Sequence, residues 1–325
     1  MRGPELSSLE LCAGAGGQAI GLEAAGFMHR ALAEVDHHCC DTLRKNRPAW
    51  QVVEQDIRTL DGSKFEGVDL LAAGLPCPPF SIAGKQLGAD DERNLFPAAL
   101  QIIEQANPRA VMIENVRGFL DAVFEDYREG LRDRLYKLGY ITAWRILNAS
   151  DFGVPQLRPR VVIVALKREF WDRFDWPQVA NQNPPTIGET LYPLMASRGW
   201  RGAERWRTKA DEIAPTLVGG SKKHGGPDLG PTRAKRAWAS LGVDGMGLAD
   251  LPPGRDELMN FMPRLTVPMV ALLQGFPKDW VFAGGKTAAY RQVGNAFPPP
   301  VAEAVALKIK QALTVRRSFR VVKAA

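Results

Sequence analysis

Short apolar segments alternate with helical patterns across residues 7–170, and this alternation limits the possible folds more than any other feature. Strands are expected at 8–12, 29–34, 52–56, 68–73, 110–114, 142–148 and 161–165. Helical patterns fall between them at 19–25, 37–46, 95–105 and 124–138. Strands that alternate with helices form βαβ units, and their parallel sheet is covered by helices on both faces. The sequence therefore predicts an α/β fold with a mostly parallel, doubly wound sheet.

The chain changes character after residue 171. Residues 172–262 are rich in Pro, Gly, Trp and Arg, with little periodicity, and residues 198–236 hold ten Lys and Arg against four Asp and Glu. Five of the eight tryptophans lie between 171 and 238, where we expect them to form the small core of a separate lobe. Helical patterns return at 264–273 and 300–313. We expect a first domain at 1–171, a smaller irregular domain at 172–287, and a segment at 288–325 that returns to the first domain.

Composition excludes several classes of protein. The 325 residues are 45% hydrophobic and 24% charged, which rules out a wholly disordered chain and a fibre. The net charge of +6 permits a polyanionic partner without requiring one. No apolar run approaches the roughly 20 residues of a membrane span, and no secretory signal is visible. All four cysteines fall within the first 77 residues, which favours reduced thiols over a disulfide framework. We expect a cytoplasmic protein.

A glycine-rich turn follows the first predicted strand, in the sequence Leu-Glu-Leu-Cys-Ala-Gly-Ala-Gly-Gly at 9–17. Glycines let a backbone approach a ligand closely, and the helix that follows begins with an electropositive end. Glu34 ends the next strand, where a carboxylate can accept hydrogen bonds from ribose hydroxyls. Asp56 ends the third. This pattern fits an adenosine-containing ligand, although a plain tight turn stays possible. The spacing differs from the G-x-G-x-x-G of dinucleotide sites, so NAD is not favoured.

A cysteine between prolines follows the fourth predicted strand, in Gly-Leu-Pro-Cys-Pro-Pro-Phe-Ser at 74–81. Prolines stiffen the backbone and remove N–H donors, so Cys77 is displayed on a rigid turn at the carboxyl edge of the sheet. Buried structural cysteines normally lie within strands or helices, so we favour a nucleophile over a structural role. Residues 83–93, which follow, suit a loop that closes over a substrate.

A glutamate and two arginines occur at the ends of two further strands. Glu114 ends the apolar segment Val-Met-Ile-Glu-Asn-Val, where a carboxylate is costly unless it is paired or used. The alternative is a helix N-cap turn in which Asn115 caps and Glu114 is incidental. Arg158 and Arg160 precede the strand at 161–165, and their spacing places them on one face of an extended segment. They could bind an anion, or form a solvated basic edge.

Six segments now make a resemblance plain. They are LELCAGAGG, GLPCPPFS, ENVRGFL, QLRPRVVIVA, RLTVPMVALLQGFP and YRQVGNAFPPPVAEAV. In this order they resemble the motifs of the cytosine-C5 DNA methyltransferases, which use S-adenosylmethionine and release S-adenosylhomocysteine. The likeness runs from about residue 8 to residue 306 and omits only the variable lobe. It implies a Rossmann-like class I methyltransferase domain at 1–171, a target-recognition domain at 172–287, and no metal.

The resemblance implies a mechanism. Cys77 attacks C6 of the target cytosine, and the covalent adduct makes C5 nucleophilic enough to take the methyl group. Glu114 contacts N3 and the exocyclic amine of the ring. Arg160 contacts the bound cytosine, and Arg158 positions the base or the adjacent phosphate. Loss of the C5 proton and elimination of Cys77 then give 5-methylcytosine.

The resemblance also assigns the cofactor site. The implied residues are Cys12, Ala13, Gly14, Ala15, Gly16, Gly17, Glu34, Val35, Asp56, Ile57, Gly74, Pro76, Leu95, Asn295, Ala296 and Phe297. Glu34 would hold the ribose, Val35 would pack on the adenine, and Asp56 would reach its edge. The family usually has phenylalanine where this chain has Cys12. We expect either a modest loss of cofactor affinity or compensation from Phe297.

DNA recognition is implied as well, because the target base must leave the helix to meet Cys77. In the second lobe, the segment APTLVGG resembles the family's Thr-Leu element and marks Thr216 and Leu217. Residues 219–226 then form either a major-groove loop or a flexible solvated turn. The candidate DNA contacts are Ser81, Lys85, Gln86, Thr216, Leu217, Ser221, Lys222, Lys223 and His224.

Other readings stay open at this point. The run His-His-Cys-Cys at 37–40 suggests zinc, but metal ligands normally come as spaced pairs, and adjacent residues on a helix face different ways. One branch of the resembled family methylates transfer RNA, and a non-catalytic nucleic-acid-binding relative is a third possibility. We favour a DNA enzyme that acts as a monomer, either alone or with a separate restriction endonuclease as its partner.

Overall fold

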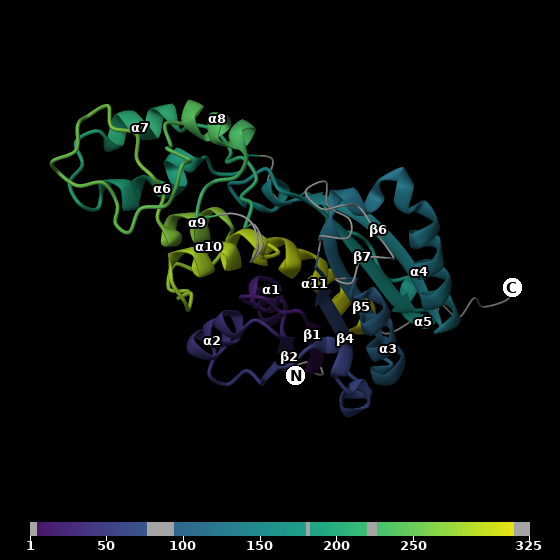
Figure 1. Ribbon diagram of the computed structural model, residues 1–325. Coiled ribbons are helices and arrows are strands. Elements are labelled where there is room, and N and C mark those ends of the chain that lie inside the picture. The colour runs from purple at the N-terminus through teal and green to yellow at the C-terminus, as the bar shows by residue number, and fades with distance from the viewer. Residues whose placement is uncertain (1–4, 77–93, 180–182, 220–225, 315–325) are drawn as a thin grey trace, which may run out of the picture.

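The computed structural model describes residues 5–76, 94–179, 183–219 and 226–314. An α/β domain stands beside a second lobe that is rich in loops (Figure 1). The helices are α1 (Gly17–Ala24), α2 (His37–Asn46), α3 (Phe96–Ala106), α4 (Glu125–Lys137), α5 (Arg168–Trp171), α6 (Ile187–Ala196), α7 (Ala203–Lys209), α8 (Thr232–Ser240), α9 (Val267–Leu273), α10 (Lys286–Asn295) and α11 (Pro299–Thr314).

A sheet in the order β3-β2-β1-β4-β5-β7-β6 forms the centre of the α/β domain. Its strands are β1 (Leu6–Leu11), β2 (Phe27–Glu34), β3 (Val52–Glu54), β4 (Leu70–Gly74), β5 (Ala110–Val116), β6 (Tyr140–Asn148) and β7 (Pro159–Lys167). β7 runs antiparallel to both of its neighbours, and every other described pairing is parallel. The predicted α/β class with a mostly parallel sheet is confirmed.

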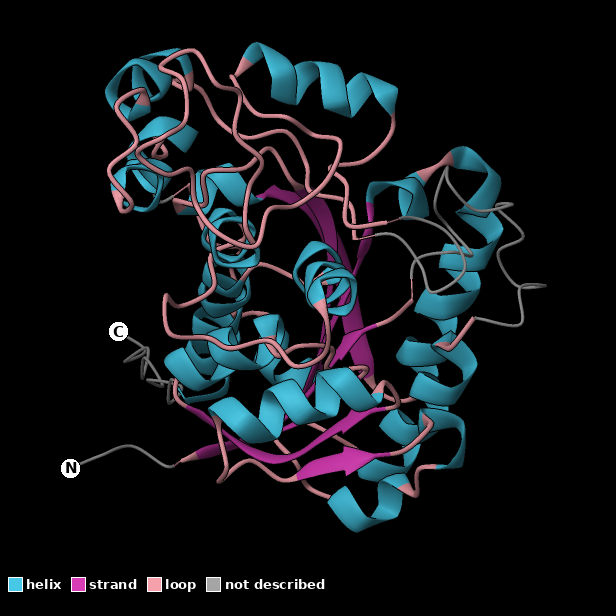
Figure 2. Cartoon of the chain, turned by 60° about the vertical axis from the view of Figure 1, so that its left-hand side comes forward, coloured by secondary structure: helices cyan, strands magenta, loops and turns pink. Residues whose placement is uncertain are grey.

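Helices cover both faces of this sheet, as Figure 2 shows. Leu71 and Ala73 of β4 face a core that includes residues of α3 and α4. Leu70 and Ala72 face the opposite core, which includes α1 and α11. Alternate residues of one strand are therefore buried on opposite sides, which explains why β4 is apolar throughout.

The second lobe has its own core, built from α6, α7, α8 and the loops between them. Trp200, Trp206 and Trp238 are buried there, as predicted from the tryptophan-rich segment. Trp171 and Trp176 are not part of that core. They pack instead against the sheet domain, on the side of α1 and α11, because the chain has not yet left that domain.

The segment from α9 to α10 joins the two parts of the chain. Residues of both helices, among them Met269 and Val293, belong to the core of the second lobe. No sequence pattern indicated α10, and the boundary expected at residue 287 falls within its first turn. Among the described residues, no helix combines the length and the apolar character needed to cross a bilayer.

One carboxyl group is buried inside the sheet domain. Glu10 of β1 is 1% exposed, and its Oε2 atom has no hydrogen-bond partner among the described residues. Burial raises the pKa of Glu10 well above its ordinary value, and the nearby negative charge of Glu34 raises it further. The native state therefore holds a proton on Glu10 more tightly than the unfolded chain does.

This difference predicts how stability depends on pH. The contribution of Glu10 is complete below the unfolded pKa of about 4.3 and is lost as the pH rises through the higher native pKa. We expect Glu10→Gln, which is neutral at every pH, to gain melting temperature relative to wild type as the pH rises from about 5 to about 8. The exposed change Glu129→Gln is the control. A constant difference in melting temperature for Glu10→Gln would contradict the assignment.

Candidate active site

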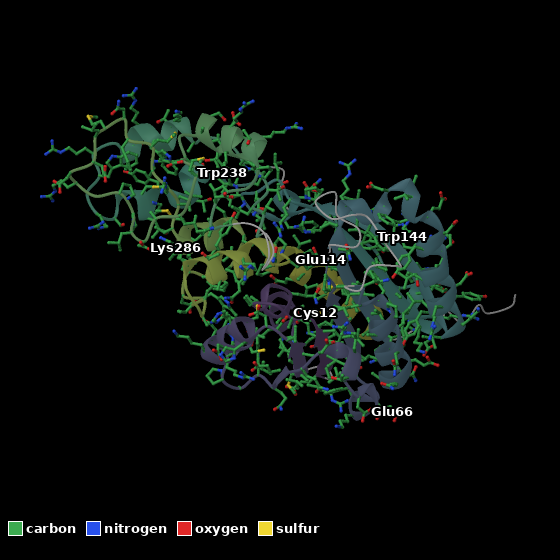
Figure 3. The ribbon with its side chains drawn as sticks, viewed as in Figure 1. Cys12, Glu66, Glu114, Trp144, Trp238 and Lys286 are labelled. Carbon is green, nitrogen blue, oxygen red and sulfur yellow. The ribbon has the colours of Figure 1, made fainter. Side chains whose placement is uncertain are left out.

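Glu114 and Arg160 form a buried ion pair across two strands. Glu114 lies within β5, and β7 runs antiparallel beside it, so that Arg160 pairs with Val116 in the sheet. Arg160 Nε lies 2.8 Å from Glu114 Oε1, and the two side chains are only 13% and 6% exposed. Figure 3 places Glu114 near the centre of the molecule, between the two lobes. The sequence analysis placed these residues on two different strands, and the fold brings them together.

Both alternative interpretations of these residues are wrong. Glu114 is inside the strand rather than in a cap, because β5 continues to Val116. The short helical turn that follows has Val116 at its N-cap, and the Asn115 side chain only accepts a hydrogen bond from the Val116 N–H. The arginines do not form a solvated edge, since Arg158 has no exposed surface and Arg160 is largely covered.

Burial and the neighbouring charges act on Glu114 in opposite directions. Burial raises the pKa of Glu114, while the charges of Arg160 and Arg158 act against that rise. A carboxyl group in such a place binds a proton more readily than an exposed one does, which suits an interaction with a ring nitrogen. Arg160 supplies a positive charge at the same point, so the pair can stabilise negative charge on a bound ring.

Arg158 has a different position. Its Nη1 atom donates to the carbonyl of Leu217 at 2.8 Å. Its Nη2 atom donates to the carbonyls of Gly294 and Ala296 at 2.7 and 3.0 Å. We expected Arg158 to position the base or the adjacent phosphate. In the structure its Nη1 and Nη2 atoms instead donate to backbone carbonyls of the protein. Arg158 therefore ties β7 to the second lobe and to the residues that follow α10.

Two buried glutamines extend this connection. Gln156 Oε1 accepts from the Leu217 N–H at 2.9 Å, and its Nε2 donates to Leu273 O at 3.0 Å and to Gln274 Oε1 at 2.7 Å. Gln274 Nε2 donates to the carbonyl of Ala296. We call Gln156, Arg158 and Gln274 the junction network. Both glutamines lie within the sequence motifs, but their hydrogen-bond partners are distant in the chain, so the motifs alone indicated no role for them.

Two glycines meet directly at this junction. A Cβ atom on Gly294 would lie 2.4 Å from the backbone nitrogen of Gly219, and one on Gly219 would lie 2.5 Å from Asn295 Oδ1. Neither position has room for a side chain. The segment that leads toward residues 220–225 is therefore pressed against the end of α10.

The candidate DNA-binding residues of the lobe are only partly described. Thr216 donates its hydroxyl to the carbonyl of Leu157, and Leu217 is buried, so both are bound into the junction. The other candidate DNA contacts lie outside the described residues, as does Cys77. They are Ser81, Lys85, Gln86, Ser221, Lys222, Lys223 and His224. Gly74, which precedes Cys77 by three residues, is the sheet partner of Glu114.

The glycine-rich turn lies where β1 gives way to α1. Gly14 has a φ of +55°, and a Cβ atom there would meet nothing within 4 Å. Gly17 is the opposite case, because its Cβ atom would lie 2.3 Å from the carbonyl oxygen of Phe297. The turn is also held from outside, since Trp280 Nε1 donates to Ala15 O at 3.1 Å. It is thus packed on one side and open above Gly14, as a ligand-binding turn requires.

Glu34 organises the open side of the turn. Its Oε2 accepts from the Gly14 N–H at 2.7 Å, and its Oε1 accepts from the N–H groups of Val35 and Asp36 at 2.8 and 2.7 Å. A carboxylate has about four acceptor positions, so about one is left for a ribose hydroxyl. Val35 beside it is 66% exposed, which leaves its side chain free to pack on a planar base.

The other residues expected to bind the cofactor differ in how much of their surface a ligand could contact. Asp56 is held by Arg58 at 2.7 Å, and hydrogen bonds from Arg58 lower the pKa of Asp56. Ile57 is buried, Pro76 and Leu95 are half-buried, and Asn295 is exposed. The residues that could meet an adenosine-containing ligand thus lie around the carboxyl ends of β1, β2, β3 and β4.

Cys12 and Phe297 lie on opposite sides of the sheet. Cys12, with a φ of +54°, packs against the core that includes Leu9 and Leu11. Phe297 is buried in the other core, with Leu22. Phe297 therefore does not pack with Cys12 in one core, and its compensation for the missing ring stays a prediction. Burial raises the pKa of the Cys12 thiol strongly, so it stays protonated.

The histidines and cysteines at 37–40 have protein partners. His37 lies 3.1 Å from carboxylate oxygens of both Asp41 and Glu54. The Cys40 thiol donates to the carbonyl of Glu34, and burial raises the pKa of Cys40 to about 12. Within the described ranges, no three His, Cys, Asp or Glu side chains gather as metal ligands do.

Solved structures share the overall fold of this chain. Dnmt2 of Schizosaccharomyces pombe matches with a TM-score of 0.61 at 19% identity and covers 95% of this chain and 98% of its own. The methyltransferase EhMeth of Entamoeba histolytica matches with a TM-score of 0.68 at 14% identity. The match covers 95% of this chain and 99% of EhMeth. At this identity the likeness concerns the fold alone, which is that of the class I methyltransferases.

Sequence relatives give the family. The model of the C-5 cytosine-specific DNA methylases matches residues 6–311. Type II methyltransferase M.NaeI of Lentzea aerocolonigenes is 56% identical over 97% of this chain and 77% of its own length. M.NgoMIV of Neisseria gonorrhoeae is 52% identical over 95% of this chain and 98% of its own. The chain belongs to the C-5 cytosine-specific DNA methylases and is a DNA cytosine-5 methyltransferase of the restriction-modification type. The resemblance seen in the sequence motifs is confirmed.

The two arginines predict different mutant behaviour. Arg158→Ala leaves buried carbonyls without donors, so we expect a loss of about 3 kcal/mol in the free energy of unfolding. Arg160→Ala leaves Glu114, which can take up a proton, so we expect a smaller loss of stability but a fall in kcat of about 100-fold or more. Denaturant unfolding and single-turnover methyl transfer measure the two effects. Equal effects on stability would refute this division of roles.

Proposed function

We propose that the enzyme methylates C5 of a cytosine extruded from duplex DNA, through a covalent bond between Cys77 and C6 of the ring. The observation that carries this proposal is the buried Glu114–Arg160 pair, with Nε and Oε1 2.8 Å apart. A protonated carboxyl group beside a guanidinium suits a pyrimidine that gains negative charge when a nucleophile adds to it. Extrusion of the base is needed because C6 is not accessible to a thiolate within a base stack.

We propose the following order of bond changes on the cytosine ring. The Cys77 thiolate forms the S–C6 bond, and Glu114 donates its proton to N3 as charge moves onto the ring. S-adenosylmethionine, when bound, would supply the methyl group to C5 from its sulfonium sulfur and would leave as S-adenosylhomocysteine. A water molecule removes the C5 proton, the S–C6 bond breaks with return of the thiolate, and N3 gives its proton back to Glu114. Arg160 keeps Glu114 oriented toward the ring throughout.

The same proposal assigns the cofactor site to the glycine-rich turn. The open space above Gly14 and the free acceptor position of Glu34 fit an adenosyl group with a ribose hydroxyl at Glu34. Exposed Val35 would pack on the adenine. We assign residues 1–171 to catalysis and cofactor binding, 172–287 to target recognition, and 288–325 to a segment that returns to the catalytic domain. We infer that the enzyme works in the cytoplasm as a monomer, without a metal.

The covalent step gives a direct test. Duplex DNA that carries 5-fluorocytosine at the target should trap the wild-type enzyme as an SDS-stable complex, because fluorine cannot leave as the proton does. Cys77→Ser should form no such complex and lose methyl transfer by roughly 1,000-fold or more, while DNA affinity stays near wild type. Glu114→Gln should also slow methyl transfer. A trapped complex with Cys77→Ser would assign the nucleophile elsewhere.

The target sequence is the second part of the proposal. M.NaeI and M.NgoMIV come from different bacteria, yet each aligns with at least 95% of this chain, including the second lobe. Because both alignments extend over the second lobe, we propose that the three enzymes methylate one shared DNA sequence. Bisulfite sequencing of one plasmid treated separately with each of the three enzymes should give one shared methylation pattern. A distinct pattern for this enzyme would reject the shared target and leave the proposed chemistry intact.

A further inference from the structure

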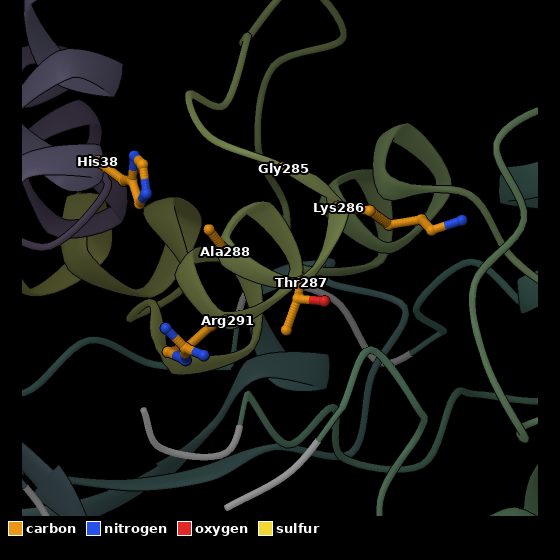
Figure 4. Close-up of a pocket in the computed structure, with 6 residues that line it drawn as sticks. All are labelled: His38, Gly285, Lys286, Thr287, Ala288 and Arg291. Atoms are coloured by element: carbon orange, nitrogen blue, oxygen red, sulfur yellow. The ribbon is translucent and has the colours of Figure 1, made fainter. Parts of the chain in front are cut away.

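A cavity of about 570 Å³ lies between α2 and the first two turns of α10. It is lined by His38, Gly285, Lys286, Thr287, Ala288 and Arg291. Figure 4 shows His38 extending from α2 across to α10, with Thr287 and Arg291 along α10 itself. This cavity contains none of the residues assigned to the base or the cofactor.

The side chains that line the cavity are basic or neutral, with no carboxylate among them. Arg291 is half-buried, and no carboxylate pairs with it among the described residues. Lys286 Nζ contacts Asp250 at 2.8 Å, but Asp250 is 83% exposed, and an exposed ion pair of this kind is weak. The cavity therefore presents two positive charges and one imidazole ring to a ligand from solvent.

The position of the cavity links it to the recognition lobe. The carbonyl oxygen of Arg291 would lie 2.7 Å from a Cβ atom on Gly219, the last described residue before 220–225. Lys286 reaches Asp250 of the second lobe, and His38 belongs to the sheet domain. A single anion bound here would contact both parts of the molecule at once.

We propose that this cavity binds a phosphate of the DNA strand outside the target cytosine, with Arg291 as its main ligand. The guanidinium presents a planar pair of donors that fits two phosphate oxygens, and duplex DNA is the polyanion on which this enzyme acts. His38 lines the same cavity from α2, whereas the Lys286 side chain points away from Arg291, toward Asp250 (Figure 4). This phosphate contact would hold the duplex where the sheet domain meets the second lobe. It would not contribute to the recognition of the DNA sequence.

The salt dependence of DNA binding tests the proposal. Each phosphate contact contributes about 0.9 to the slope of log Kd against log salt concentration. We expect Arg291→Ala to lower this slope by about 0.9 and to weaken binding about tenfold at ~0.1 M salt, equally for target and non-target duplexes. Arg291→Lys should keep most of the slope. Arg134→Ala, an exposed arginine on α4, removes the same charge at a distance and is the control.

The other outcomes separate the possible anions. An unchanged slope for Arg291→Ala, or an equal change for Arg134→Ala, would overturn the proposal. Weaker binding of S-adenosylmethionine with unchanged DNA affinity would place the cofactor carboxylate in the cavity. Binding of inorganic phosphate that Arg291→Ala abolishes, without any change in the DNA slope, would mean a free-ion site. None of these results depends on Cys77, so the proposed chemistry is tested separately.

Discussion

The reversed direction of β7 is the constraint on which the active site depends. Because β7 runs antiparallel between β5 and β6, its first residues lie beside the carboxyl end of β5, where Glu114 is placed. A parallel strand would have put Arg160 at the opposite edge of the sheet. The carboxyl and guanidinium groups are then held by backbone pairing rather than by a loop, which keeps their geometry rigid.

The residues just before this strand also anchor the second lobe. Arg158 lies two residues before Arg160, and it binds carbonyl groups from both the lobe and the end of α10. One short stretch of chain thus pairs one arginine with Glu114 and joins the second lobe with the other. Gln156 and Gln274 complete the assembly, and all of their described partners are buried. Buried polar groups that satisfy one another favour a single arrangement, so this network holds the lobe in place relative to Glu114.

Much of the sheet domain could be predicted from the sequence, because its apolar periods are strong. The helix expected at 37–46 has those bounds in the structure, and the strand at 52–56 was only slightly too long. Glu114 was predicted by the cost of burying a carboxylate, and Arg160 by its place in the motif. The position of Arg158 could not be predicted. Arg158 and Arg160 are two residues apart on one extended segment, and the sequence does not show which one contacts Glu114.

The remaining differences have similar causes. α10 was missed because its buried face includes Gln292 and Gly294 beside only three apolar side chains, Ala289, Tyr290 and Val293. Trp171 and Trp176 were assigned to the wrong core because composition shows neighbours in the chain but not in space. Phe297 was expected to compensate for the missing ring at Cys12, and the structure places these two side chains in different cores.

The contact between Gly219 and Gly294 limits how such an enzyme can evolve. Neither glycine has room for a side chain. A substitution at either one would push the backbone at Gly219 away from the end of α10. The chain therefore passes from the second lobe to the end of α10 through a contact that tolerates glycine alone on both sides. An exchange of the lobe between related enzymes would have to keep both glycines.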